Sequence, residues 1–280
     1  MDYKVLNNGV KMPVLGYGVY QVSSEECERC VLDAISVGYR SIDTAQAYNN
    51  EESVGNAIEK CGVPRSELFI TTKVWISNGG YEKAKASIAE SLKKLKTDYI
   101  DLLLIHQPFN DYYGTYCAMT EAYKDGKVRA IGVSNFYPDR LIDFCQFQEV
   151  VPAVNQVETH PFQQQKAAHE FMKKYGVQHE SWGPFAEGRK DMFTNPIVKS
   201  IGDKYGKSVA QVVLRFLIQS DVVVIPKSSH KERMIENLNV FDFTLTAEDM
   251  NAIAAMDENE SAFFSHYDPK TVEFLTSLGR

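Results

Sequence analysis

The chain has 280 residues, of which 44% are hydrophobic and 24% are charged, and its formal net charge is −7 at pH 7. This composition is typical of a folded globular protein and excludes a disordered chain, a fibrous rod and a small disulfide-rich scaffold. The dispersed basic residues are outnumbered by acids, which argues against a nucleic-acid partner. We find neither a signal-peptide pattern nor an apolar run long enough to span a membrane, so we expect a cytoplasmic protein without a membrane partner.

The five cysteines are scattered along the chain and form no disulfide framework. Cys27 and Cys30 make a CxxC motif, which raises the alternative of a zinc or redox site. Both fall on an apolar helical stripe with Val31 and Ala34, and no second pair of cysteines or histidines supplies further ligands. We therefore expect two thiols that pack in a helix interface, and no metal site.

The first elements of the chain are a hairpin, a short strand and a helix. Residues 3–6 and 10–12 flank an Asn-Gly pair at 8–9, which is typical of a tight type I′ turn. The apolar run 14–19 predicts a strand. A Ser-Ser-Glu-Glu capping box followed later by glycine predicts a helix over 23–37.

Beyond this helix, strand-sized apolar runs alternate with amphipathic helices. The predicted strands are 40–43, 68–74, 99–105, 128–133, 153–157, 177–181 and 222–225. The predicted helices are 51–61, 84–95, 115–124, 138–148, 164–175, 197–204, 209–219, 231–238 and 246–256. Strands this apolar need helices on their outer face, as in a parallel sheet.

The number of repeats decides the form of the sheet. About eight strands, each followed by a helix, fit a closed (β/α)8 barrel, and no linker divides residues 1–280 into separate domains. The competing architecture is a doubly wound nucleotide-binding sheet with a GxGxxG motif. Gly16-Tyr17-Gly18 lacks the third glycine of that motif, so we predict a single α/β barrel with an N-terminal hairpin and extra C-terminal helices, the first of them over 246–256. We expect the tail that follows to pack near the mouth of the barrel.

Polar residues gather where the predicted strands end. In barrels of this type the chemistry lies at the carboxyl ends of the strands. Each residue alone has an ordinary structural explanation, but together they form a ring. Its members are Asp43, Lys73, His106, Ser134, Asn135, Gln156, Trp182, Lys227 and Ser228, with Tyr48 in the loop after the first of them.

Four ionisable residues of this ring come from neighbouring strands and can meet in one cleft. A tyrosine with an ordinary pKa of ~10 is a weak acid, but an adjacent ammonium lowers that pKa, and Lys73 can supply it to Tyr48. Asp43 can keep Lys73 charged, and His106 can orient the oxygen of a substrate. The sequence thus predicts a proton donor centred on Tyr48, while a buried ion pair with an uninvolved tyrosine is the alternative.

These residues lie in motifs that resemble those of the aldo-keto reductase superfamily. Residues 38–51, GYRSIDTAQAYNNE, are similar to the signature that carries its catalytic Asp and Tyr. Further similar motifs follow in the same order at 70–75, 103–106, 131–136, 155–158, 225–228 and 233–237. The resemblance covers residues 3 to about 260 and implies an enzyme that reduces aldehydes or ketones with NADPH.

The resemblance also implies roles for individual residues. The catalytic set is Asp43, Tyr48, Lys73 and His106, and the substrate is expected to contact Tyr20, Trp75 and His106. The nicotinamide is expected to contact Ser134, Asn135 and Gln156 and to stack on Trp182, where the family often has tyrosine. The 2′-phosphate is expected at Lys227, Ser228 and Arg233, and the adenine at Glu236 and Asn237.

Short loops, as in bacterial-type members of the superfamily, imply an open site for small aldehydes, dicarbonyls or keto sugars, with no obligate protein partner. Gln107 stands where many members have tryptophan, so we expect that wall to be more polar. One alternative is a metal-dependent barrel hydrolase, which the spacing of the other histidines does not favour. A second alternative is an NADPH-binding redox sensor with slow turnover.

Overall fold

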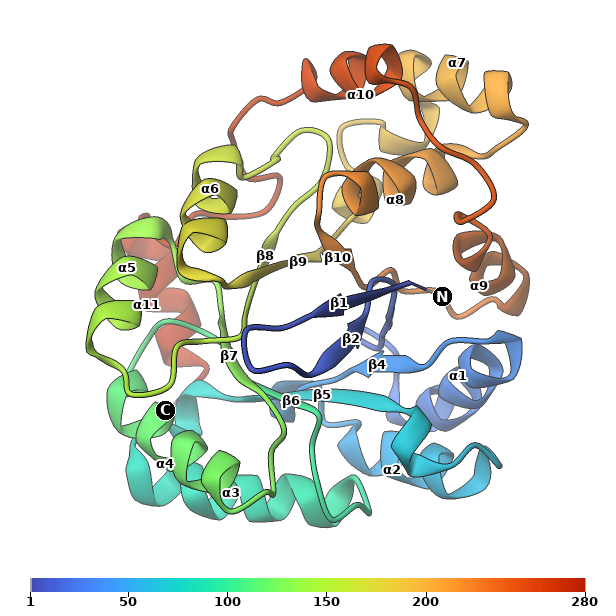
Figure 1. Cartoon of the computed structure of the whole chain (residues 1–280). Coiled ribbons are helices and arrows are strands. Elements are labelled where there is room, and N and C mark those ends of the chain that lie inside the picture. Colours follow the sequence, from blue (N-terminus) through green and yellow to red (C-terminus); the bar gives the residue numbers. More distant parts are fainter. Residues whose placement is uncertain (1, 280) are drawn as a thin grey trace.

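The computed structural model describes residues 2–279 and shows eight parallel strands that surround a central axis (Figure 1). Each strand pairs with the next one along the chain, from β3 to β10, as expected when every crossover is a helix. The strands are β3 Tyr17–Gly18, β4 Ser41–Asp43, β5 Phe69–Val74, β6 Leu102–Ile105, β7 Ile131–Ser134, β8 Val154–Glu158, β9 Gln178–Trp182 and β10 Val223–Val224.

The first and last strands meet and close the sheet. Leu15 forms a parallel bridge with Val224, the backbone N–H of Gly16 donates to the Val224 carbonyl at 2.8 Å, and Val224 donates back to Val14 at 3.0 Å. A sheet closed in this way has no free edge strand. The predicted (β/α)8 barrel is therefore confirmed.

Helices surround the barrel and cover its outer face (Figure 1). They are α1 Ser24–Val37, α2 Glu51–Lys60, α3 Tyr81–Lys94, α4 Tyr112–Lys124, α5 Pro138–Phe147, α6 Lys166–Tyr175, α7 Pro196–Tyr205, α8 Val209–Gln219, α9 Lys231–Leu238, α10 Ala247–Ala254 and α11 Pro269–Ser277. In the described part of the chain, no helix is both long and apolar enough to cross a membrane.

The N-cap and the C-terminal glycine that the sequence predicted are present in α1, but the reciprocal bond of a capping box is not, because the Glu26 side chain contacts Arg29 instead. Ser23 accepts a hydrogen bond from the backbone of Glu26, and Gly38 ends the helix in the left-handed region at a φ of 118°. Cys27 and Cys30 are fully buried on the inner face of this helix as free thiols. Their expected packing role is confirmed.

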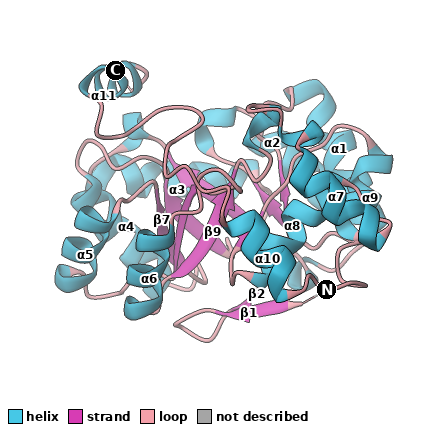
Figure 2. Ribbon diagram, turned by 90° about the horizontal axis from the view of Figure 1, so that it is seen from above, coloured by secondary structure: helices cyan, strands magenta, loops and turns pink. Residues whose placement is uncertain are grey.

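The N-terminal hairpin, β1 Tyr3–Val5 and β2 Lys11–Pro13, lies across one end of the barrel (Figures 1 and 2). Leu6 and Met12 are buried in one cluster with barrel residues that include Phe69 and Leu102. This apolar cluster fills the end of the barrel where the strands begin, because the hairpin shields it from water.

The turn of the hairpin differs from the expected type I′. The backbone of Leu6 donates to Val10 and that of Gly9 donates to Leu6, both at 2.9 Å, so the loop has three residues. Gly9 has a φ of 85°, whereas neither Asn7 nor Asn8 has a positive φ. A type I′ turn needs a positive φ at both central residues, so the observed turn is type I followed by a left-handed glycine.

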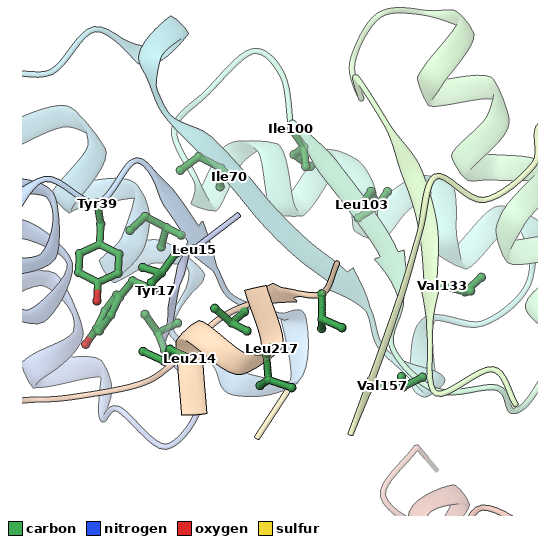
Figure 3. Packing of buried hydrophobic residues seen from close by; sticks show 14 of the residues in the cluster. Leu15, Tyr17, Tyr39, Ile70, Ile100, Leu103, Val133, Val157, Leu214 and Leu217 are labelled. Carbon is green, nitrogen blue, oxygen red and sulfur yellow. The ribbon is translucent and has the colours of Figure 1, made fainter. Parts of the chain in front are cut away.

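The larger core lies between the barrel and the helices (Figure 3). Tyr17 and Tyr39 meet there with ring centroids 5.9 Å apart. Their hydroxyls donate to backbone carbonyls of Ser228, at 2.5 Å, and Met234, at 3.1 Å. Two core tyrosines thus fix the segment that follows the last strand.

The Gly-x-Gly sequence of β3 serves close packing. A side chain at Gly16 would lie 2.9 Å from the Ser41 hydroxyl, and one at Gly18 would lie 3.0 Å from the Ile225 carbonyl. Both contacts are too short for a Cβ atom. The glycines therefore allow the strand to approach its neighbours on both sides of the seam that closes the barrel.

The last helix, α11, lies at the end of the molecule opposite the hairpin (Figure 2). Leu275 of this helix is buried with Ile76 and Phe109. The sequence predicted extra C-terminal helices and a tail near the mouth of the barrel, and both are confirmed, although it gave no residue range for α11. α11 thus lies at the end of the barrel where the strands finish, toward one side of it.

Candidate active site

The barrel interior changes from apolar to polar along its axis. Side chains of a strand alternate in direction, so Phe69 and Lys73 of β5 lie on the same face. Phe69 belongs to the apolar cluster at the hairpin end, and Lys73 lies near the opposite end of its strand. Lys73, Asp43 and Gln156 are all buried there. This polar layer contains the residues that the sequence placed at the strand ends.

An ion pair lies at the centre of the layer. The Lys73 ammonium donates to Asp43 Oδ1 at 2.5 Å and to the Thr44 carbonyl at 3.0 Å, and neither charged side chain is appreciably exposed. Burial alone would lower the pKa of Lys73, but the surrounding acidic groups, Asp43 above all, act in the opposite direction and the pKa is raised. Lys73 is therefore a fixed positive charge inside the barrel.

Tyr48 is held against this charge by a short 3₁₀ helix, Gln46–Tyr48. The Gln46 side chain accepts a hydrogen bond from the backbone of Trp75 at 2.9 Å, and Asn49 ends the helix with a φ of 55°. Asparagine adopts this left-handed conformation more readily than most residues. The ammonium of Lys73 lies 5.1 Å from the centroid of the Tyr48 ring.

The acidity of Tyr48 is set by two opposing effects. Burial raises its pKa to about 12, and the Lys73 charge acts in the opposite direction without cancelling this increase. Lys73 by itself lowers the pKa of Tyr48, as expected from the sequence. Burial raises this pKa by more, so the net change is opposite to the expected one. Tyr48 is protonated at neutral pH, so it can give a proton and cannot accept one.

His106 follows β6 and lies between two aromatic side chains. Its ring centroid is 5.5 Å from that of Tyr48 and 5.0 Å from that of Trp75. Burial, and then the Lys73 charge, lowers the pKa of His106 well below its ordinary value, so the ring is neutral. Within residues 2–279, nothing forms a hydrogen bond with its buried Nδ1. A neutral imidazole carries one N–H, which can bind an oxygen atom.

The walls of the cleft come from both ends of the chain. The ring of Tyr20 lies 5.0 Å from that of Tyr48, and the indole of Trp75 donates to the Leu278 carbonyl at 3.4 Å. His266 Nε2 lies 2.6 Å from the side-chain oxygen of Gln107. The sequence did not identify His266, because nothing local indicates that the tail returns to this wall.

Three residues expected to contact the nicotinamide lie side by side at the ends of β7 and β8. The Ser134 hydroxyl donates to the Gln156 carbonyl at 2.8 Å, and Asn135 has a φ of 63°. Trp182, at the end of β9, donates from its indole to Asn135 Oδ1 at 2.9 Å. Trp182 is half-buried and its ring packs against Phe263 of the tail, so it is not a core tryptophan. Amides, a hydroxyl and a flat ring fit a planar carboxamide-bearing ring.

The residues expected at the 2′-phosphate lie at and before the start of α9. Lys227 and Arg233 are exposed, and neither forms an ion pair with any residue in 2–279, whereas nearby Lys231 pairs with Asp33. Two cations without carboxylate partners fit a dianionic phosphate. Ser228 is buried nearby, and the expected adenine contacts are the half-buried Glu236 and the buried Asn237.

One buried residue of the polar layer was missed. Glu180 of β9 is fully buried and accepts a hydrogen bond from Gln156 at 3.0 Å. It lies two positions before Trp182, so strand alternation places both on the same side of the sheet. That spacing was the available signal in the sequence.

Comparisons with known proteins agree with this site. The Aldo/keto reductase family profile matches residues 14–258. The chain is 48% identical to glyoxal reductase of Bacillus subtilis (strain 168), covering 92% of this chain and 94% of that protein. It is 43% identical to methylglyoxal reductase DkgA of Escherichia coli (strain K12), covering 91% of this chain and 93% of that protein. The structure of a Bombyx mori aldo-keto reductase in complex with NADP matches with a TM-score of 0.90 and 33% identity. The match covers 97% of this chain and 96% of that one.

The family profile spans most of the chain, and the similar proteins match along nearly their whole length. The fold agrees with the sequence comparison, because the solved reductase superimposes over almost the entire barrel. The chain therefore belongs to the aldo/keto reductase family and is an oxidoreductase of carbonyl compounds.

Proposed function

We propose that the protein reduces small aldehydes and ketones to alcohols with NADPH, and that Tyr48 donates the proton. When bound, NADPH supplies the hydride that forms the new C–H bond and is left as NADP⁺. The proton forms the O–H bond, so one carbonyl compound, one NADPH and one proton give one alcohol and one NADP⁺. The observation that carries the proposal is the buried Lys73–Asp43 pair against the ring of Tyr48, with neutral His106 beside it.

The chain's own groups divide the work on the substrate oxygen. His106 donates its N–H to this oxygen and orients it, which a neutral ring with a lowered pKa can do. Tyr48 gives its proton as negative charge develops on the oxygen, and Lys73 stabilises the tyrosinate that remains. Asp43 holds Lys73 in place and keeps it charged. Protonated solvent then restores Tyr48.

The residues proposed to hold NADPH fall into two groups. Ser134, Asn135, Gln156 and Trp182 hold the nicotinamide, and Lys227, Ser228 and Arg233 hold the 2′-phosphate, with Glu236 and Asn237 near the adenine. Lys227 and Arg233 form no ion pair within residues 2–279, which supports a preference for NADPH over NADH, since NADH has no phosphate for them to bind.

We propose small α-dicarbonyl compounds and other small aldehydes as substrates. Two similar proteins are named glyoxal reductase and methylglyoxal reductase. The cleft supports this choice, because Trp75 and Tyr20 supply apolar surface while His106 and the Gln107 that follows it supply polar groups. A substrate with a second carbonyl next to the first can use both kinds of contact.

The test is consumption of NADPH by the purified protein with glyoxal, methylglyoxal and simple aldehydes. Tyr48→Phe removes only the proton donor, so we expect kcat to fall ~10²- to 10⁴-fold while NADPH still binds. Tyr81→Phe is the matched control, since Tyr81 lies on α3 and its hydroxyl contacts Glu121. It should keep full activity.

Binding of NADPH without turnover of any carbonyl, in wild type as in Tyr48→Phe, would contradict the proposed reaction and favour the redox-sensor alternative. Equal activity of wild type and Tyr48→Phe would reject Tyr48 as the donor while leaving the reductase activity in place. Turnover by wild type separates the two outcomes, and a fluorescence titration of NADPH before the assay shows that the cofactor binds in either case.

A further inference from the structure

The proposed reaction leaves one buried carboxylate without a role. Glu180 is 0% exposed, and its Oε2 accepts a hydrogen bond from Gln156 Nε2 at 3.0 Å. Its Oε1 is also buried and has no hydrogen-bond partner among residues 2–279. Leaving a polar atom buried and unpaired is costly, so such an atom in a reaction centre calls for an explanation.

Glu180 and Asp43 share the same amide. Gln156 Nε2 donates to Asp43 Oδ2 at 2.9 Å and to Glu180 Oε2 at 3.0 Å, which uses both of its hydrogens. The reverse orientation would point the amide oxygen at two carboxyl groups and is repulsive when they are charged. The side-chain oxygen of Gln156 is thus left to accept a hydrogen bond from another molecule, such as the carboxamide N–H of a nicotinamide.

The charged groups that face Glu180 come from strands that do not neighbour β9 and face it across the barrel interior. They are Asp43 of β4 and Lys73 of β5, while its strand partners are the uncharged Gln156 of β8 and Val223 of β10. Two carboxylates therefore face one ammonium. Burial, and then the charge of Asp43, raises the pKa of Glu180 to about 8. Glu180 consequently changes its charge close to neutral pH.

We propose that Glu180 is a positioning residue that fixes the Gln156 amide between two carboxyl groups and, by gaining or losing one proton, changes the relative affinity for oxidised and reduced cofactor. This inference rests on the proposed function. The oxidised nicotinamide ring carries a positive charge that the reduced ring lacks, so an ionised Glu180 favours NADP⁺. The same added negative charge opposes ionisation of Tyr48 and weakens it as an acid.

The test measures the dissociation constants of NADP⁺ and NADPH between pH 6 and pH 10 by fluorescence titration of wild type and Glu180→Gln. Glutamine has the same shape and still offers an oxygen to Gln156, but it cannot ionise. We expect the preference for NADP⁺ in wild type to increase at least tenfold as pH rises through 8, because a unit charge at an effective dielectric constant of about 20 has an effect of this size even at a separation of about 12 Å. In Glu180→Gln the preference should stay at the low-pH value of wild type.

A second measurement needs neither cofactor nor activity. Because the pKa of Glu180 is raised in the folded protein, the folded state holds a proton that the unfolded state releases between pH 4.5 and 8. Stability from this group is therefore lost as pH rises across that range. The Tm of wild type should fall relative to that of Glu180→Gln from pH 5 to pH 8 and then stay parallel to it.

Glu51→Gln is the matched control. Glu51 of α2 is also a buried glutamate, and burial raises its pKa, but its Oε1 accepts from the Thr72 hydroxyl at 2.7 Å, outside the Gln156 contacts. This variant should keep the wild-type pH dependence of the cofactor preference. Glu180→Met has neither a charge nor a carboxyl acceptor, so it should lose the pH dependence of the cofactor preference. It provides a second variant if Glu180→Gln does not fold.

The outcomes separate this inference from the function on which it rests. A glutamine or methionine variant that retains the wild-type pH dependence would overturn the role of Glu180, while the effect of Tyr48→Phe on turnover would still support the reductase. Loss of the pH dependence in Glu51→Gln as well would also overturn it. If wild type bound neither NADP⁺ nor NADPH, the proposed function itself would fail, and this inference with it.

Discussion

The ammonium of Lys73 lies 2.5 Å from Asp43 Oδ1 inside the barrel, where neither side chain reaches water. Such a pair returns little net stability, because both charges had to leave water to form it. Removing one partner is costly, since the other is left buried and unpaired. The pair is therefore better explained by what its charge does for Tyr48 than by stability.

Asp43→Ala should lower the free energy of unfolding by ~3–5 kcal/mol, because it leaves the Lys73 ammonium buried without a partner. Urea unfolding followed by circular dichroism measures this loss. Asp203→Ala is the control, because Asp203 pairs with Lys199 on the surface and both side chains are mostly exposed. It should show no measurable change, and equal losses in the two variants would refute the argument from burial.

Arg233→Ala should reduce the preference for NADPH over NADH by ~10- to 100-fold, the effect of losing one hydrogen bond to a charged group. The ratio of kcat/KM for the two cofactors measures it. Lys231→Ala is the control, since Lys231 is exposed on the same helix but pairs with Asp33. A decrease of equal size with NADPH and NADH would mean that Arg233 does not contact the 2′-phosphate.

His266 links the stability of the tail to pH. Burial, and then the charge of Arg140, lowers its pKa to about 4, below the ordinary 6.5 of the unfolded chain. The unfolded state therefore binds the extra proton first, and stability is lost as pH falls from 6.5 towards 4. His266→Gln should show a smaller decrease in Tm over this range than wild type, and His230→Gln, at an exposed site, the same decrease as wild type. A His266→Gln curve parallel to wild type would be the contrary result.

Gly132 of β7 lies close against the backbone of the neighbouring strand β8. A Cβ atom there would lie 2.5 Å from the backbone carbonyl of Val154, which cannot move without displacing β8. Gly132→Ala should cost about 3 kcal/mol of stability in urea unfolding. Gly126→Ala, in open space but with a φ of 75°, should cost only about 1 kcal/mol from backbone strain. The order of the two losses is the outcome to check.

Local interactions explain why most elements could be predicted from sequence. The helix that begins after Ser23 and the capping box of Thr246 and Asp249 depend on residues within one turn, so the sequence contains the whole signal. The predicted strand 14–19 is shorter in the structure, with Tyr17–Gly18 as the strand and a single bridge at Leu15. Its pairing partners come from the far end of the chain, and no local pattern specifies them.

The candidate site was predictable in part. Strand order brought Asp43, Lys73 and His106 to one end of the barrel, and the structure places them together with Tyr48. Their catalytic roles remain predictions. The direction of the Tyr48 pKa was not predictable, because it depends on how deeply the ring is buried once all the helices are in place.

The hairpin at the amino end gives the barrel a single entrance. Leu6 and Met12 close the opposite end with apolar side chains, so any molecule that reaches Lys73 must come from the side where α11 lies. The N-terminal hairpin therefore restricts the approach of any substrate or cofactor to the same end of the barrel, so both must reach the polar layer from the side of the strand carboxyl ends.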